Sequence, residues 1–351
     1  MPNVPIIDFA RWRDGSAEEK RQFAEELGQV CHRVGFFHLV NHGIDIEFQE
    51  KIKSMMRDLF RLPLHEKEKI SKTLSPHFRG WEALGTERTN GRVDYREQVD
   101  TWTDRAPRAE DPDKPYMRLY GPSQYFEDSV LPGYRALTRE WFARCTFVSD
   151  ALLDAMAVAL GLEENFFRQK FGASTDRMSL TKWIYYPGSK TGQHGVNAHK
   201  DTGFLTLLLP DGPGLEVQHQ NGAWLPVQSV PGAFVVNLGE ILQSLTGQYF
   251  VATPHRVVTS RERYSCAYFH GPHLDFQVSQ KLKLDPKFEK AVAASPFHRN
   301  AKFMARKEET AAGVGDMGSP HIPNTYGEQL WNYFSRAYPD IVQSFYPRSR
   351  L

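Results

Sequence analysis

Apolar residues recur every three to four positions in three segments of the chain, which predicts amphipathic helices. These segments are residues 18–34, 46–60 and 130–172. Ser16, followed three positions later by Glu19, forms a capping-box signature at the start of the first segment. A last helix is expected to run from Tyr326 to about Tyr338 and to end at Pro339.

After residue 178 the pattern changes to short runs of β-branched and aromatic residues between Gly- and Pro-containing turns, which is typical of strands. Strands are expected at residues 4–8, 35–40, 98–102, 179–186, 204–209, 215–218, 224–227, 234–238, 250–252, 256–258 and 264–269. Asn221-Gly222 is the strongest hairpin signal. So many short strands predict a sandwich, a barrel or a jelly roll, and the fold class is mainly β with flanking α.

The same patterns divide the chain into three parts. Residues 1–130 form an N-terminal helical and mixed region, residues 131–340 a helical support with the β-rich core, and residues 341–351 a tail. Within the second part, the polar stretch at residues 301–324 predicts an exposed loop.

Composition excludes several classes of function. Lys and Arg number 43 against 42 Asp and Glu, so the charge favours neither a nucleic acid nor a membrane surface as partner. Three scattered cysteines indicate a reducing compartment rather than a disulfide framework. The start, MPNVPIIDF, lacks the charge and apolar run of a signal peptide, and no apolar run could span a bilayer. We therefore expect a cytoplasmic protein, a monomer or weak homodimer, that acts on a small molecule.

Two histidines and an aspartate form the strongest candidate for chemistry. His199 and Asp201 are two positions apart just before an expected strand, so in an extended chain their side chains share one face. His255 lies in a later run of strand-like sequence. Two imidazoles and one carboxylate match the facial triad of non-haem iron(II) oxygenases, although zinc can use the same ligands in a hydrolase.

A second pair, Arg263 and Ser265, follows His255 across an expected turn. The two side chains share one face of a strand. A guanidinium beside a hydroxyl is suited to hold a carboxylate, and a dicarboxylate that chelates the metal at one end would need such a clamp at the other. The metal site and the clamp together favour iron(II) with 2-oxoglutarate as co-substrate and O2 as oxidant.

With these residues in place, the chain resembles the isopenicillin N synthase-like branch of iron(II)/2-oxoglutarate-dependent dioxygenases. The segments that carry the resemblance are VPIID at residues 4–8, VGFFHLVNHGI at 34–44, NAHKDTGFLT at 197–206 and PGAFVVNLGE at 231–240. The resemblance implies a double-stranded β-helix, which is a jelly roll, with N-terminal helices and a C-terminal helix. It also implies that Tyr186 lies beside the co-substrate. The chain departs from the family at Ile184, where an Asn is common, and at Glu240, where an Asp is usual.

The substrate is less evident from the sequence. We expect its site to involve polar or aromatic residues of the irregular segment 79–102 and of the C-terminal helix. The candidates are Arg79, Trp81, Glu87, Thr89 and Arg336. The chain also has some similarity to bacterial ethylene-forming enzymes, which use arginine, and Glu87, Thr89 and Arg336 fall near their arginine-binding positions. Lys182 and Thr202 stand where those enzymes have Arg and Tyr.

The predicted activity is hydroxylation, desaturation or cyclisation of a small molecule, such as an amino acid or peptide, with release of succinate and CO2. Three alternatives to it stay open. An isopenicillin N synthase-type oxidase would not need 2-oxoglutarate, and Gln343 is a poor match to its C-terminal glutamine. A zinc hydrolase would leave Arg263 and Ser265 without a role. A jelly-roll binding protein that has lost catalysis would not require an intact triad.

Overall fold

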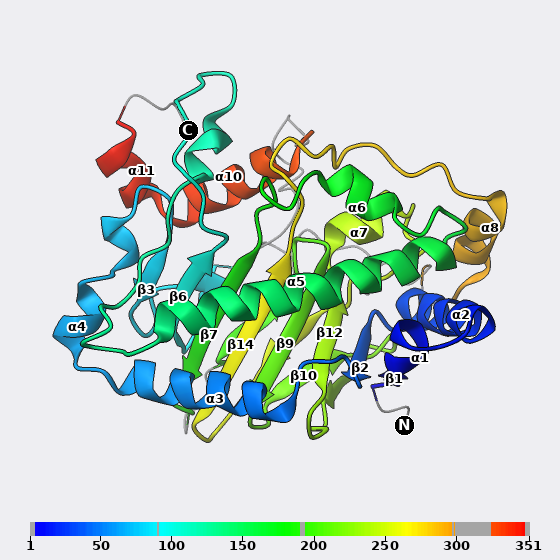
Figure 1. Cartoon of the computed structure of the whole chain (residues 1–351), viewed down its shortest axis with the longest axis horizontal. Coiled ribbons are helices and arrows are strands. Elements are labelled where there is room, and N and C mark those ends of the chain that lie inside the picture. The colour runs from blue at the N-terminus through cyan, green and yellow to red at the C-terminus, as the bar shows by residue number, and fades with distance from the viewer. Residues whose placement is uncertain (1–3, 90, 190–193, 297, 299–323, 348–351) are drawn as a thin grey trace.

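Two largely antiparallel sheets of unequal size form the centre of the structure (Figure 1). The computed structural model describes residues 4–89, 91–189, 194–296, 298 and 324–347. The expected loop at residues 301–324 lies, up to residue 323, outside the described residues.

The larger sheet has eight strands in the order β1-β2-β12-β9-β14-β7-β6-β3. These are β1 (Ile6–Asp8), β2 (Phe36–Val40), β12 (Phe234–Leu238), β9 (Leu205–Asp211), β14 (Arg263–His270), β7 (Leu180–Tyr186), β6 (Glu97–Trp102) and β3 (Gly80–Glu82). All neighbours are antiparallel except β1 and β2. Strands from both the N-terminal region and the β-rich core therefore belong to one continuous sheet.

The smaller sheet has four strands in the order β11-β10-β13-β8. These are β11 (Trp224–Pro226), β10 (Leu215–Gln218), β13 (His255–Val257) and β8 (Val196–His199). A separate hairpin pairs β4 (Arg88–Thr89) with β5 (Arg92–Val93). One apolar cluster joins the two sheets, with Ile184 and Val235 from the larger and Val217 and Val257 from the smaller. Two sheets that face each other in this way form the predicted jelly roll, so the fold-class prediction is confirmed.

Helices cover the other face of the larger sheet. In Figure 1, α3 (Ile46–Arg61) and α5 (Tyr134–Ala159) lie across it, and α2 (Ala17–Arg33) packs beside them. Fully buried aromatic pairs make this contact: the rings of Trp141 and Phe234 have centroids 5.8 Å apart, and those of Tyr134 and Trp183 are 5.5 Å apart. Such buried aromatic area contributes much of the stability of a core.

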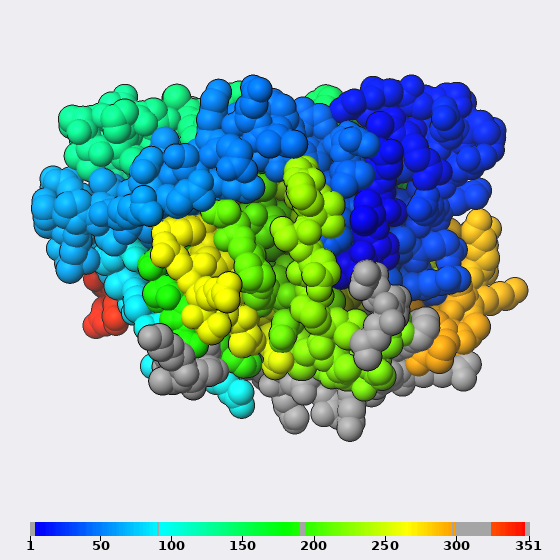
Figure 2. All heavy atoms as spheres, turned by 90° about the horizontal axis from the view of Figure 1, so that it is seen from below, coloured from blue at the N-terminus to red at the C-terminus, as the bar shows by residue number. Residues whose placement is uncertain are grey.

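The remaining helices are short or lie at the C-terminal end. They are α1 (Ala10–Arg13), α4 (Leu64–Glu68), α6 (Phe166–Phe171), α7 (Glu240–Leu245), α8 (Pro286–Ala294), α10 (Tyr326–Ala337) and α11 (Pro339–Phe345), with 3-10 turns at Lys72–Leu74 and Pro115–Leu119. Seen from below in Figure 2, the N-terminal helices form a blue band along one side, and the green to yellow loops of the two sheets fill the middle. Within the described residues, no helix has the length and apolarity needed to cross a membrane.

The ends of α2 show why the local sequence folds as predicted. The Ser16 hydroxyl accepts a hydrogen bond from the backbone N–H of Glu19, and the Glu19 carboxylate accepts one from the backbone N–H of Ser16. After the helix, Gly35 adopts φ +65°, and a Cβ there would lie 1.9 Å from the carbonyl oxygen of Val251. Only glycine fits this turn into β2.

The structure differs from the sequence-based expectations at several short segments. Residues 250–252 are not a strand, because the N–H of Val251 donates to the carbonyl of Cys31 and that of Ala252 donates to Gln243. Several short elements were not predicted, because each is short and its periodicity is weak: β3, β4, β5, β8, α1, α4, α7 and α8. The predicted tail forms α11, because Pro339 suits a first helical turn and the helix buries Ile341 and Val342.

Leu207 tests the packing of the sheet core. It pairs with Val236 of β12 and Tyr268 of β14 and is fully buried. We expect Leu207→Ala to lower the free energy of unfolding by about 3 kcal/mol, because it leaves a cavity between tightly packed strands. Phe147→Ala on the exposed face of α5 is the control and should change it by less than about 0.5 kcal/mol. Chemical denaturation measures both, and equal effects would contradict the assigned core.

Candidate active site

The smaller sheet brings the two histidines together. His199 ends β8, His255 begins β13, and the two residues are directly paired across these strands. Asp201 follows in the loop to β9, and its Oδ1 lies 3.5 Å from the Nε2 atom of each histidine. The three ligand atoms lie within 4.8 Å of one another. The sequence-predicted triad is therefore assembled with its ligand atoms facing one point.

Backbone and side-chain partners orient all three ligands. Nδ1 of His199 lies 2.8 Å from the carbonyl oxygen of Asn197, and Nδ1 of His255 lies 3.2 Å from that of Thr253. Since a carbonyl only accepts, each Nδ1 carries the proton and each Nε2 keeps its lone pair for a metal. Oδ2 of Asp201 accepts hydrogen bonds from Thr206 at 2.5 Å and from Asn237 at 2.6 Å, which leaves Oδ1 free for a cation.

The ionisation of these groups suits a metal site. Burial alone would raise the pKa of Asp201, but His255 and His199 more than offset it and hold the pKa below its usual value. Burial, with His199 beside it, lowers the pKa of His255 to about 4. An ionised carboxylate beside a neutral imidazole is the form that binds a divalent cation. The donor set therefore fits Fe(II) bound through a facial triad.

Arg263 and Ser265 lie on β14, in a cavity that the triad also lines. Nη1 of Arg263 donates to the Ser265 hydroxyl at 3.2 Å, and Nε donates to the carbonyl of Gly212 at 3.3 Å. Nη2 is buried and has no hydrogen-bond partner among the described residues. The Tyr186 ring lies 4.8 Å from the guanidinium carbon, and Ile184 contributes an apolar wall. A buried guanidinium nitrogen without a partner fits a ligand that brings a carboxylate.

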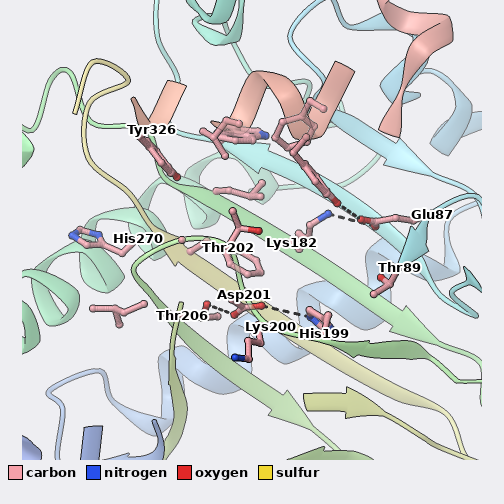
Figure 3. Close-up of a pocket in the computed structure, with 18 of the residues that line it drawn as sticks. Glu87, Thr89, Lys182, His199, Lys200, Asp201, Thr202, Thr206, His270 and Tyr326 are labelled. Atoms are coloured by element: carbon pink, nitrogen blue, oxygen red, sulfur yellow. Dashed lines mark hydrogen bonds and ion pairs between the residues drawn. The ribbon is translucent and has the colours of Figure 1, made fainter. Parts of the chain in front are cut away.

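A second, larger cavity shares His199 and Asp201 with the first, and Figure 3 shows residues that line it. Its aromatic and aliphatic walls come from β6, β7, β9, β14 and the C-terminal helix α10. The apolar lining residues are Trp102, Leu180, Leu205, Phe269, Tyr326, Leu330, Tyr333 and Phe334. The polar lining includes Glu87, Thr89, Arg96, Lys182 and His270. Since His199 and Asp201 line this cavity too, a molecule bound in it would lie beside two of the three metal ligands.

The structure separates the five expected substrate residues. Glu87 and Thr89 line the cavity. Arg79 is fully buried elsewhere, donates to the carbonyl of Leu119 and stacks on Trp102. The Trp81 indole N–H donates to Glu97, away from the lining. Arg336 is exposed on α10 and donates to the backbone carbonyl of Asn332 one turn earlier.

Sequence reasoning did not assign a role to several residues that matter here. Thr206 and Asn237 hold the Asp201 carboxylate, and both lie in the motifs that carried the family resemblance. Tyr333 and Phe334 line the cavity, and the strong amphipathic pattern of α10 was the available signal for a helix that packs over the core. Arg96 carried no local signal, because the segment that holds it and its partners Glu87 and Asp94 has no clear periodicity.

A buried network of charges lies behind one wall of the larger cavity, and Glu87, Arg96 and Lys182 are the members that line it. Glu87 accepts from Arg96 at 2.8 Å, from Lys182 at 3.5 Å and from the Tyr333 hydroxyl at 3.1 Å. Burial would raise the pKa of Glu87, but Arg96 and Lys182 hold it well below its usual value. The network as described contains three cations and four carboxylates: Lys72, Arg96, Lys182, Glu82, Glu87, Asp94 and Asp100. It thus has one negative charge in excess.

Comparison with known proteins identifies two family models along the chain. Residues 4–128 match the N-terminal model of non-haem dioxygenases described from morphine synthesis, and residues 173–272 match the 2OG-Fe(II) oxygenase superfamily. The second match contains all three triad residues and the Arg263–Ser265 pair.

Curated relatives include fungal and plant proteins. A 2-oxoglutarate-dependent dioxygenase of Gibberella zeae is 27% identical, with 98% of this chain and 91% of the relative covered. A homoarginine-6-hydroxylase of Arabidopsis thaliana is 30% identical, with 78% of this chain and 79% of the relative covered.

Solved structures have the same fold. A full-length Neurospora crassa protein, solved in complex with alpha-KG, superposes with a TM-score of 0.71 at 22% identity, over 94% of this chain and 95% of that one. JOX2 in complex with 2OG, Fe and JA superposes with a TM-score of 0.64 at 26% identity, over 80% of this chain and 78% of that one.

The triad can be tested by metal content. We expect His199→Ala and Asp201→Ala to reduce bound iron from about one per chain to near zero, because two remaining ligands hold Fe(II) weakly. The far-UV circular dichroism should stay unchanged. His219→Ala, in the β10–β11 hairpin, is the control and should keep its iron. Anaerobic reconstitution followed by elemental analysis measures this, and full iron occupancy in both triad variants would show that the metal binds elsewhere.

Proposed function

This chain belongs to the 2OG-Fe(II) oxygenase superfamily and is a non-haem Fe(II)- and 2-oxoglutarate-dependent dioxygenase, and we propose that it hydroxylates a small amino acid with a basic side chain. In the proposal, His199, Asp201 and His255 hold the iron. Bound Fe(II) and 2-oxoglutarate supply the oxidising chemistry, in which O2 is consumed and succinate and CO2 are released.

The observation that carries the use of 2-oxoglutarate is the buried Nη2 of Arg263, which has no partner among the described residues. It lies in a cavity that the triad also lines. Burial lowers the pKa of Arg263, and Tyr186 partly offsets this effect. The guanidinium still stays a cation at neutral pH, and a buried cation without a matching anion is costly. A carboxylate from the co-substrate would remove that cost, with the Ser265 hydroxyl as a further donor and Tyr186 packed on the guanidinium.

We expect Arg263→Gln to weaken 2-oxoglutarate binding by roughly 10- to 100-fold, because one or two hydrogen bonds to a charged group are lost. Iron content should not change. Anaerobic titration of the Fe(II) protein with 2-oxoglutarate measures the affinity, and Arg261→Gln in the preceding turn is the control. If Arg263→Gln bound 2-oxoglutarate like the unsubstituted protein, the co-substrate would not use this cavity.

The charge of the network behind the larger cavity supports a basic substrate. The described network has one negative charge in excess, and Glu87 is its carboxylate that lines the cavity, beside Arg96 and Lys182 (Figure 3). Lys200 points away from Glu87 in the same view, on the other side of Asp201. An ammonium or guanidinium group near Glu87 would balance the charge. The homoarginine hydroxylase among the relatives supports the same substrate class.

Succinate release in the presence of candidate amino acids tests the substrate. We expect L-homoarginine and L-arginine to stimulate it, and L-citrulline, a neutral analogue, to stimulate it far less. Glu87→Gln should lower kcat/KM for the basic amino acids by roughly 10- to 100-fold, because a charge-assisted hydrogen bond is lost in a buried site. Glu216→Gln, a surface carboxylate of β10, is the matched control. Equal stimulation by citrulline would exclude recognition of a cation.

The same assay separates the alternatives. An isopenicillin N synthase-type oxidase would consume O2 without making succinate, and an inactive binding protein would do neither. The similarity to the bacterial branch makes headspace ethylene a further product to measure. Because Lys182 and Thr202 replace the Arg and Tyr of ethylene-forming enzymes, we propose hydroxylation as the main reaction.

We also propose a cytoplasmic enzyme that is a monomer or weak homodimer. The cysteines support a reducing compartment, since Cys31, Cys145 and Cys266 are all buried and free.

A further inference from the structure

Asp94 connects the wall of the larger cavity to the metal-binding strand β8. Its Oδ1 accepts two hydrogen bonds from Asn197, one from the backbone N–H at 3.0 Å and one from the side-chain amide at 2.8 Å. Its Oδ2 accepts from the Thr89 hydroxyl at 2.7 Å and pairs with Nη2 of Arg96 at 3.2 Å. Asp94 is fully buried, so four donors hold one carboxylate in place away from water.

The contact continues from Asn197 to the metal site. The carbonyl of Asn197 accepts the hydrogen bond from Nδ1 of His199 at 2.8 Å. This bond sets the tautomer and the ring orientation of the ligand. Whatever shifts Asn197 therefore shifts His199, and Asp94 is the group that holds both the backbone and the side chain of Asn197.

At the other end, Arg96 joins Asp94 to the cavity. A single nitrogen, Nη2, lies 2.8 Å from Glu87 and 3.2 Å from Asp94. Arg96 lines both cavities, and its Nε has no hydrogen-bond partner among the described residues. The two carboxylates thus share one donor nitrogen, and a change in the charge of Glu87 alters how strongly Arg96 is drawn to Asp94.

We propose that Asp94 and Arg96 are positioning residues that couple occupancy of the cavity at Glu87 to the orientation of the metal ligand His199. A basic group bound at Glu87 competes with Arg96 for that carboxylate. The guanidinium then moves toward Asp94, and the shift passes through Asn197 to His199. This inference rests on the proposed function, because it takes the cavity at Glu87 as the substrate site.

The test measures metal affinity and needs neither substrate nor turnover. The apo form of the full chain is titrated with Co(II), and both the dissociation constant and the visible d–d absorption are recorded. Glu87→Gln mimics a neutralised Glu87, and it is made in the unsubstituted protein and in two further backgrounds, Asp94→Asn and Arg96→Met. Two backgrounds are used so that the cycle is complete if one variant is unstable.

We expect Glu87→Gln to weaken Co(II) binding about threefold to tenfold and to shift the d–d bands. This loss of affinity is smaller than the usual loss when a residue in direct contact with a metal ligand is substituted. In the Asp94→Asn or Arg96→Met background the same substitution should change the dissociation constant by less than about 1.5-fold, because the connection is already broken.

The control background is Glu216→Gln. This substitution breaks the ion pair between Glu216 and Arg256, whose charged atoms are 2.7 Å apart. Arg256 is the residue next to the ligand His255, but Glu216 has no contact with Glu87. There, Glu87→Gln should have its full effect.

A purely electrostatic effect of the lost charge would weaken Co(II) binding equally in every background. That result, or no effect of Glu87→Gln in the unsubstituted protein, would overturn the proposal. Since the cycle uses Co(II) alone, a failed substrate screen would reject the basic substrate and leave the cycle unaffected.

Discussion

The register between β8 and β13 is the constraint on which the active site depends. His199 and His255 are paired across these two strands, so their rings project from the same face of the small sheet. Asp201 completes the set only because Thr206 of β9 and Asn237 of β12, both in the larger sheet, hold its second oxygen. The metal site is thus built between the two sheets. A shift of one residue in either pairing would point a ligand to the opposite face.

The jelly roll divides the space around this centre into two chemically different cavities. One contains a buried arginine with an unused donor and accepts a carboxylate. The other has apolar walls from α10 and a charged wall of Glu87, Arg96 and Lys182. His199 and Asp201 line both cavities, so a co-substrate in one and a substrate in the other can both reach the metal site. Arg96 and Lys182 lie at the boundary and line both cavities as well.

Buried charges of this kind are expensive unless each finds a partner. Glu87, Asp94 and Asp100 each contact one or more cations, and two tyrosines of the C-terminal segment, Tyr333 and Tyr338, donate to the same network. The C-terminal helix therefore closes the cavity through polar contacts in addition to apolar packing. A network that lines the proposed substrate cavity on one side and holds β8 on the other can respond to occupancy of that cavity.

The sequence by itself predicted the metal ligands, the Arg263–Ser265 pair and the longer helices and strands. His199 with Asp201, and Arg263 with Ser265, are each two positions apart in extended chain, so their shared faces follow from local geometry. The helices and strands followed from their periodicity in the same way. Only the tertiary structure decided which polar residues near the site face the cavity. Arg79 donates to a backbone carbonyl and Trp81 donates to Glu97, so neither lines the cavity, whereas Arg96 does. Those choices depend on the pairing of β3 with β6 and of β4 with β5, and on where α10 packs. The pairing of β3 with β6 and the packing of α10 join distant segments, and no local period records which side chains then face the cavity.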